Sequence, residues 1–228
     1  MKISIIIPVL NESLCIAQTL LNLQPWREEG HEVIVVDGGS EDRTAELSRP
    51  LADQVLLSPR GRGLQMNAGA KAARGNLFLF LHADTLLPKE GTRVILEKME
   101  EGRRVWGRFD VKLSGKHLLL RVIELLMNCR SRVTHIATGD QAIFVKREIF
   151  EAVGGFPEMD LMEDIVLSKR LIKGYSLPCC LWQRVLTSSR RWEKEGILRT
   201  ILLMWFLRGA YFFKVNPDRL AKFYRRTR

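Results

Sequence analysis

Residues 31–43, HEVIVVDGGSEDR, contain the pattern that decides the fold. The β-branched run from His31 to Asp37 predicts a buried strand, and the two glycines after it predict a tight turn. Ser40 and the two acidic residues that follow predict the first turn of a helix, where the helix dipole favours carboxylates. This stretch therefore predicts a strand–turn–helix unit with an aspartate at the carboxyl end of the strand.

The same alternation runs through the first 88 residues. Strands are expected at residues 2–8, 31–37, 53–58 and 76–81, and helices at 11–23, from 40 onward and at 63–74. Such alternation predicts a parallel sheet flanked by helices, which binds ligands at the carboxyl ends of its strands. The predicted fold class is α/β, with a Rossmann-like, mostly parallel sheet and amphipathic helices at the C-terminus.

The pattern is looser after residue 88. Strands are expected at residues 105–113, 139–145 and 175–186, and helices at 116–127, 146–153, 163–173, 196–215 and from 218 onward. We divide the chain into one domain, residues 1–195, and a basic amphipathic helical tail, residues 196–228. Within the domain, residues 1–88 and 89–195 form two halves.

The composition is that of an ordinary globular protein, with 46% hydrophobic and 27% charged residues in a chain of 228. The net charge of +10 is concentrated at residues 187–228, which contain 11 Lys and Arg against 3 Asp and Glu. Such a segment indicates an anionic partner, which is membrane lipid, nucleic acid or a phosphate-rich substrate. The absence of a CxxC pair, of a signal-peptide core and of a run of about 20 apolar residues predicts a cytoplasmic protein.

Polar residues follow the predicted strands. Asp37 can accept hydrogen bonds from a base or a ribose, or it can cap the next helix, and the segment alone leaves both interpretations open. Asp84 suits Mg²⁺ or Mn²⁺ on a diphosphate, and a contribution from His82 would favour Mn²⁺. The alternative is that Asp84 lies in an ordinary turn and that His82 is a core histidine.

Three further segments carry candidate chemistry. Glu163 and Asp164 open a predicted helix, where they are either an ordinary acidic first turn or a general base. The residues Arg190, Arg191 and Trp192 suit a phosphate clamp or an exposed basic turn. The helix at 196–215 is apolar with basic residues along it, so it suits a membrane surface, packing on the domain or a dimer interface.

The order of six segments resembles a family 2 glycosyltransferase of the inverting, GT-A type. These segments are SIIIPVLNES, VIVVDGGSEDRTAEL, RGRGLQMNAGAKAARGNLFLFLHADT, GDQAIFVKREIFEAVGGF, EDIVLSKRL and SRRW. The resemblance covers residues 2–195, and within the family the chain is similar to a small, single-domain bacterial group. It implies a nucleotide-sugar-binding half at residues 1–88 and an acceptor and catalytic half at residues 89–195.

The resemblance also implies roles for individual residues. The implied donor-binding positions are Pro8, Asn11, Glu12, Asp37, Gly39, Ser40, Arg60, Asn67, Arg191 and Trp192. Asp84 matches the last position of the metal-binding DxD motif, and His82 stands at its first position, with Mn²⁺ or Mg²⁺ as the ion. Asp164 matches the base of the Glu-Asp motif, with Glu163 beside it. Ser188 replaces the Gln of the QxxRW motif, which is typical of polymer synthases, so single transfer is favoured.

The implied reaction is transfer of one sugar, of the hexosyltransferase type, from a UDP- or GDP-linked donor to a hydroxyl of a small molecule or a lipid. Asp164 would remove the proton from that hydroxyl, and the ion on Asp84 with Arg190 or Arg191 would neutralise the departing diphosphate. The other expected partners are an anionic membrane surface, contacted by residues 196–228, and a second copy in a homodimer, with no nucleic acid. The expected location is cytoplasmic and peripheral to the inner membrane.

Two alternatives to glycosyl transfer stay open. The first is a sugar nucleotidyltransferase, although residues 8–12 lack the glycine-rich loop of that class. The second is a non-catalytic basic module that binds membrane or nucleic acid, which the basic tail favours and the acidic residues Asp84, Glu163 and Asp164 disfavour.

Overall fold

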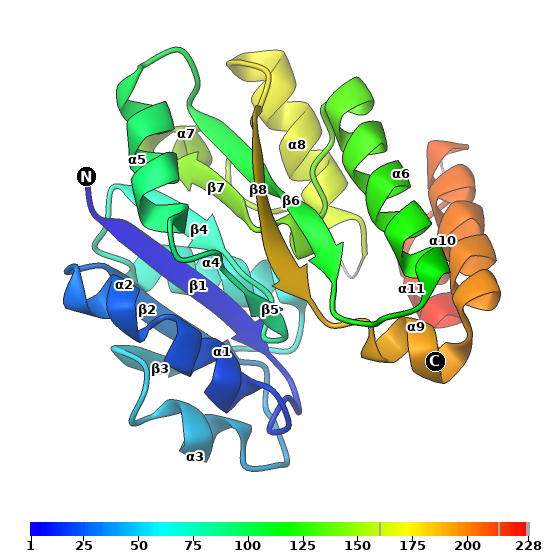
Figure 1. Ribbon diagram of the computed structural model, residues 1–228, viewed down its shortest axis with the longest axis horizontal. Coiled ribbons are helices and arrows are strands. Elements are labelled where there is room, and N and C mark those ends of the chain that lie inside the picture. The colour runs from blue at the N-terminus through cyan, green and yellow to red at the C-terminus, as the bar shows by residue number, and fades with distance from the viewer. Residues whose placement is uncertain (160, 214, 227–228) are drawn as a thin grey trace.

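The computed structural model describes residues 1–159, 161–213 and 215–226, and it forms one sheet with helices on both faces (Figure 1). The strands of these residues are β1 (Ile3–Val9), β2 (Glu32–Asp37), β3 (Gln54–Leu57), β4 (Leu77–Phe80), β5 (Thr85–Leu86), β6 (Trp106–Leu113), β7 (Ile143–Lys146) and β8 (Cys179–Thr187). The helices of the same residues are α1 (Ile16–Asn22), α2 (Gln24–Glu28), α3 (Thr44–Ser48), α4 (Arg62–Ala72), α5 (Gly91–Glu100), α6 (Leu118–Thr134), α7 (Arg147–Ala152), α8 (Glu163–Gly174), α9 (Arg190–Glu195), α10 (Ile197–Phe212) and α11 (Pro217–Arg226), with one 3₁₀ turn, η1 (Gly139–Gln141).

The strand order is β3-β2-β1-β4-β7-β6-β8-β5. The four strands from β3 to β4 are parallel, as are β6 and β8, whereas β7 is antiparallel to both of its neighbours and β5 is antiparallel to β8. The predicted α/β class with a mostly parallel sheet is confirmed. The register places Val9 opposite Asp37, so the ends of β1 and β2 meet at one edge of the sheet.

Alternate residues of β1 enter two separate cores. Ile3, Ile5 and Ile7 pack with apolar side chains of α1, α5 and α6 on one face of the sheet. Ile6 packs with side chains of α4, α7 and α8 on the other face. This period of two is the reason that an uninterrupted apolar run forms a strand covered on both sides.

A third, smaller core joins α10 and α11 to the rest of the molecule. Met162 and Ile165, at the start of α8, pack there with Leu207 of α10 and Leu220 of α11. In Figure 1 these two helices lie at the right edge, beside α6. None of the described helices has the length and apolar composition needed to cross a bilayer.

Several predicted boundaries are wrong. The helices α1 and α3 begin later than expected, at Ile16 and Thr44, because the residues before them form hydrogen-bonded loops. The strand expected at 139–145 is divided into η1 and β7, since a capping box between Thr138 and Gln141 closes a 3₁₀ turn and Ala142 has a φ of 48°. The helix expected at 196–215 is observed as α10, and Lys214 lies outside the described residues, as do residues 227–228 of the predicted tail.

Candidate active site

The loops after β1 and β2 are joined by a chain of hydrogen bonds. Asp37 Oδ1 accepts from the amide and the hydroxyl of Ser40, at 2.9 and 2.7 Å. The Ser40 hydroxyl oxygen accepts from the amide of Asn11 at 2.9 Å, and Asn11 Oδ1 accepts from the amide of Glu41 at 2.8 Å. Gly39 has a φ of 88°, a conformation that glycine adopts without strain. The structure therefore brings together Asn11, Asp37, Gly39 and Ser40, as the sequence predicts.

Asp37 keeps one carboxylate oxygen for a further partner. Its side chain is 4% exposed, and Oδ2 accepts no hydrogen bond from the described residues. An ionised carboxylate accepts several hydrogen bonds, so Oδ2 can take an N–H or a hydroxyl from a ligand. Pro8 is the last residue but one of β1, beside this loop, and its register partner is Val36.

An ion pair between a 38% exposed arginine and a buried glutamate links the two halves of the chain. Arg62, the first residue of α4, pairs with Glu163, whose side chain is 1% exposed. Oε2 of Glu163 is buried and has no partner among the described residues. Arg62 Nη1 also lies 3.4 Å from His82 Nε2. The guanidinium thus connects the end of β4 with the start of α8.

Asp164 is buried beside this pair. Its Oδ2 accepts from the amide of Gly139 at 2.9 Å, and its Oδ1 accepts from the amide of Ile165 at 2.8 Å. Burial raises the pKa of the Asp164 carboxyl, and the neighbouring charge of Glu163 raises it further, while Arg62 acts in the opposite direction. A carboxylate with a raised pKa binds a proton more readily, which is the property that a general base requires.

His82 is surrounded by these charged groups. Burial lowers the pKa of its imidazole, as does the charge of Arg62, whereas Asp84, Asp140 and Glu163 oppose the shift. A Cβ added to Gly139 would clash with His82 Nε2, so the ring packs directly against that backbone. Burial and Arg62 therefore favour the neutral form of this closely packed imidazole.

The loops at the ends of β4 and β8 meet at Asp84. The amide of Ser188 donates to the backbone oxygen of Asp84 at 3.1 Å. Two residues further on, Arg190 Nη2 lies 3.2 Å from Glu12 Oε2 in an ion pair. Cys15 Sγ donates to the same oxygen at 3.2 Å, and burial and this carboxylate raise the pKa of the thiol to about 12. The Glu12 carboxylate is thus engaged by protein groups.

The sequence was compared with models of known families. The model of glycosyl transferase family 2 matches residues 4–154, which is more than half of the chain. The chain belongs to glycosyl transferase family 2. The resemblance inferred from its motifs is confirmed, and a glycosyltransferase is the enzyme class of this family.

Relatives in this family are longer than this chain. A probable glycosyltransferase of Bacillus subtilis, YdaM, is 28% identical over 220 residues, which cover 85% of this chain and 51% of that protein. The poly-beta-1,6-N-acetyl-D-glucosamine synthase of Staphylococcus aureus is 25% identical over 195 residues, which cover 77% of this chain and 47% of that protein. The chain therefore spans about half the length of these curated relatives.

Solved structures share the fold. TarS of Staphylococcus aureus, in a fragment crystallised with UDP-GlcNAc, has a TM-score of 0.65 at 20% identity, and the match covers 82% of this chain and 58% of that one. Glucosyl-3-phosphoglycerate synthase of Mycobacterium tuberculosis, crystallised with Mn²⁺, UDP and glucosyl-3-phosphoglycerate, has a TM-score of 0.62 at 16% identity, covering 82% and 70%. These GT-A structures agree with the predicted fold class.

The side chains at the strand ends fit a divalent cation in part. The Asp84 carboxylate is partly exposed and accepts one long hydrogen bond, at 3.5 Å from Thr85, so it can serve as an oxygen ligand. His82 does not fit, since its Nε2 faces the guanidinium of Arg62 and the backbone of Gly139. The described residues contain no group of three His, Cys, Asp or Glu side chains placed to hold a metal. An ion on Asp84 would therefore need oxygen ligands from a bound phosphate and from water.

The side chains of Arg190, Arg191 and Trp192 contact different parts of the molecule. They lie in the first turn of α9 and not in an exposed turn. Arg191 points away from Glu12, to Glu195 and to Tyr224 of α11, with its guanidinium 4.6 Å from the ring centroid of Tyr224. Trp192 packs against the core formed with α1, α5 and α6. Of this segment, the structure places Arg190 beside the loop after β1.

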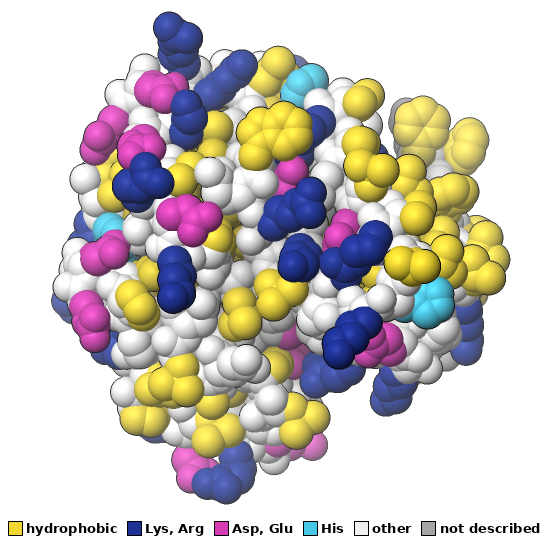
Figure 2. Space-filling view, in the orientation of Figure 1, with side chains coloured by type: hydrophobic (Ala, Val, Ile, Leu, Met, Phe, Trp, Pro, Cys, Tyr) yellow, Lys and Arg dark blue, Asp and Glu magenta, His cyan; other side chains and the backbone are white. Residues whose placement is uncertain are grey.

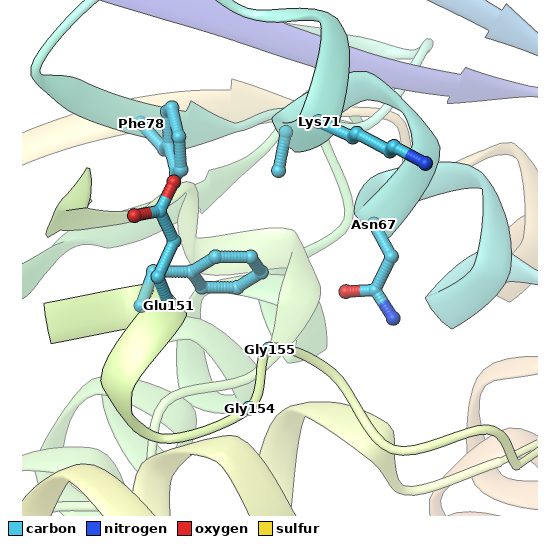
Figure 3. A pocket seen from close by; sticks show the side chains of 8 residues that line it. Asn67, Lys71, Phe78, Glu151, Gly154 and Gly155 are labelled. Atoms are coloured by element: carbon cyan, nitrogen blue, oxygen red, sulfur yellow. The ribbon is translucent and has the colours of Figure 1, made fainter. Parts of the chain in front are cut away.

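Asn67 is held by the chain itself, and Arg60 is exposed. The Asn67 amide donates to the backbone oxygen of Phe156 and accepts from the Phe156 amide, both at 2.9 Å. Asn67 also lines a cavity of about 300 Å³ between α4 and α7, where Lys71 and Glu151 lie on opposite sides (Figure 3). This cavity lies against Phe78, on the face of the sheet, and not at the strand ends that carry Asp37 and Asp84.

Sequence reasoning missed two residues at the site, Arg62 and Gln65. Arg62 pairs with Glu163. Asp140, which the resemblance places on the acceptor side, has a buried Oδ1 without a partner among the described residues. Gln65 donates from Nε2 to the backbone oxygens of Val9 and Val36, both at 2.8 Å, and so fixes the ends of β1 and β2. The signal available for Arg62 was its place one residue after Gly61, before a helix that follows a strand.

Proposed function

We propose that the chain transfers one sugar from a UDP- or GDP-linked donor to an acceptor hydroxyl, with inversion at the anomeric carbon. The observation that carries this proposal is the burial of Asp164 beside Glu163, with both carboxylate oxygens fixed by backbone amides and with a raised pKa. Because the family is one of glycosyltransferases, such a group is best interpreted as the base that deprotonates the acceptor.

The donor nucleotide would lie across the loops after β1 and β2. Asp37 Oδ2 would accept a hydrogen bond from the base or the ribose, and the glycine turn beside it lets a ligand approach the backbone. UDP is favoured as the nucleotide, because the TarS and glucosyl-3-phosphoglycerate synthase structures that share the fold contain UDP-GlcNAc and UDP. The synthase structure also contains Mn²⁺, which supports a divalent cation here.

Asp84 would hold that cation, with Mn²⁺ or Mg²⁺ as the ion. When bound, a divalent cation supplies positive charge to the diphosphate and so favours its departure. Arg190, which is half exposed and pairs with Glu12, adds a second positive charge near the same edge. Asp164 takes the proton of the acceptor hydroxyl, whose oxygen forms the new bond to the anomeric carbon as the bond to the diphosphate breaks. The amides of Gly139 and Ile165 position Asp164, and burial raises its pKa, with Glu163 acting in the same direction and Arg62 in the opposite one.

The proposed setting is the cytoplasmic side of a membrane, with a small molecule or a lipid as acceptor and α10 and α11 as the segment that contacts lipid. The length and basic charge of residues 196–228 support this setting. A homodimer through the same helices is a second assembly to be tested. The family match favours glycosyl transfer over the nucleotidyltransferase and over the non-catalytic module.

The test uses water as the acceptor, since many transferases hydrolyse their donors slowly. Release of UDP or GDP is measured from UDP-glucose, UDP-GlcNAc and GDP-mannose with Mn²⁺ present, and NMR records the first anomer of the freed sugar. We expect an α-linked donor to give the β sugar, and we expect Asp164→Asn to lower the rate by at least about 10²-fold. The matched control is Glu148→Gln, an exposed carboxylate on α7.

Two results would contradict the proposal. Release of the α anomer from an α-linked donor would exclude inversion. An unchanged rate in Asp164→Asn, with the donor still bound, would exclude Asp164 as the base.

A further inference from the structure

The outward sides of α6 and α10 contain large apolar side chains. On α10 the outward residues Leu202, Trp205 and Phe206 are 66%, 66% and 57% exposed. On α6 the outward residues Leu118, Leu125 and Leu126 are 80%, 62% and 55% exposed. Large apolar side chains gathered on one surface normally have a partner, so these six side chains, called here the apolar face, lack the cover that they would be expected to have.

The two helices form one surface. Leu120 and Ile123 of α6 pack against the same core as Ile197 and Ile201 of α10. In Figure 1 the helices lie side by side at the right edge, and Figure 2 shows apolar side chains gathered over that edge. Contiguous apolar areas above about 400 Å² are uncommon on soluble monomers and mark sites of protein or membrane contact.

The charges around the apolar face are mostly positive, and the exception is the exposed carboxylate of Glu193, on α9, beside Gly115. Helix α10 contains no acidic residue, and the single acidic residue of α6, Glu124, is 4% exposed. Exposed cations border the face at Lys116 before α6, at Arg199 on α10 and at Lys222 on α11. Within the described side chains, these three cations form no ion pair. An apolar surface with a basic border is complementary to an anionic bilayer, which offers acyl chains beside phosphate groups.

We propose that the apolar face docks on an anionic lipid bilayer, with α6 and α10 lying at the level of the headgroups. This inference deepens the membrane setting proposed above, because it assigns half of the contact to α6, which lies outside the basic tail. It also brings the catalytic end of the domain close to the lipid, since Leu207 on the inner side of α10 packs against Met162 and Ile165, which flank Asp164.

A second copy of the chain is the competing occupant. A two-fold interface presents the same surface from both partners, so it would place Arg199 and Lys222 of each copy near those of the other. Like charges brought together at an interface oppose association. The charge pattern therefore favours lipid over self-association.

The test is sedimentation with vesicles of phosphatidylcholine alone and of phosphatidylcholine with about 30% phosphatidylglycerol. We expect the full chain to sediment with the anionic vesicles and to be released as the salt concentration rises. The double variant Leu125→Gln, Leu126→Gln on α6 and the single variant Trp205→Gln on α10 should each weaken binding about tenfold or more. The matched control is Leu57→Gln, which changes a leucine 81% exposed on the edge strand β3 and should bind as the unchanged chain does.

Three outcomes would overturn the inference. They are a full chain that sediments with neither vesicle, an α6 variant that binds normally while Trp205→Gln does not, and a dimer by light scattering that the α6 variant dissociates.

Calorimetric binding of UDP by each variant is measured separately. A variant that binds UDP normally has a folded strand-end site, and a full chain that binds vesicles but no nucleotide would contradict the proposed function without affecting the docking face.

Discussion

The two sides of the candidate active site hold their carboxylates in different ways. Asp37 is held by Ser40, three residues further along the chain, so the loop after β2 forms its own binding geometry. Glu163 is held by Arg62, 101 residues earlier in the chain, and Asp164 is held in part by Gly139. The Asp37 carboxylate is therefore held by a contact within its own loop, which Asn11 and Gln65 join to the end of β1, whereas the Glu163 and Asp164 carboxylates depend on the packing of distant segments.

The largest expected effect comes from breaking the long-range contact. Arg62→Ala leaves Glu163 buried without its cation, and an unpaired buried charge of this kind costs about 3 kcal/mol. We expect the free energy of unfolding, measured by urea denaturation, to fall by about that amount.

The control for this variant is Arg43→Ala. It removes a pair with Glu46 in which both side chains are mostly exposed, so the expected loss is under about 1 kcal/mol. Equal losses in the two variants would contradict the distinction between the two sides of the site.

The second prediction concerns the local contact. Asp37→Ala removes the carboxylate proposed to contact the nucleoside, and a hydrogen bond to a charged group contributes about 1.5–3 kcal/mol. The affinity for UDP should therefore fall about tenfold to a hundredfold by calorimetry. Ser40→Ala keeps the Asp37 carboxylate and should have a smaller effect. An unchanged affinity in Asp37→Ala would place the nucleotide elsewhere.

The third prediction tests Asn67, which the resemblance assigns to donor binding. Its two hydrogen bonds to Phe156 indicate a structural role. Asn67→Leu should lower the free energy of unfolding by about 1–2 kcal/mol and leave the affinity for UDP unchanged. A tenfold loss of affinity at unchanged stability would instead support the donor-binding role.

The smallest expected effect is a shift in the dependence of rate on pH. The base must be deprotonated, and the pKa of Asp164 lies above the ordinary value of about 4 because of burial and Glu163. The rate should therefore fall as the pH falls through this raised pKa. Since Arg62 acts to lower it, Arg62→Ala should move the acid limb of kcat/KM to higher pH. If the acid limb of the kcat/KM profile lies at the same pH in Arg62→Ala as in the unchanged chain, Arg62 does not set the charge state of Asp164.

The sequence predicts the strand and turn around Asp37 well for a physical reason. The strand at 31–37, the glycine turn and the Asp37–Ser40 contact all lie within ten residues, so periodicity and turn chemistry are sufficient to place them. The class of the fold follows from the same local signals, since the alternation of strand and helix determines a parallel sheet.

The rest could not be predicted in the same way. Arg62 is an ordinary basic residue at a helix start until the fold brings Glu163 to it. Helices α5 and α9, which begin after Glu90 and Ser189, were not predicted from the sequence. The direction of Arg191, toward Tyr224 of α11, depends on the packing of the C-terminal helices.

The most direct test of the account is calorimetric titration of the full chain with UDP, GDP and their sugar conjugates, in Mn²⁺, in Mg²⁺ and in EDTA. The account predicts that one nucleotide sugar binds in a metal-dependent manner, that Asp84→Ala abolishes this binding and that Asp164→Asn retains it. Binding of no nucleotide under any metal condition would contradict the assignment of the strand ends as the donor site.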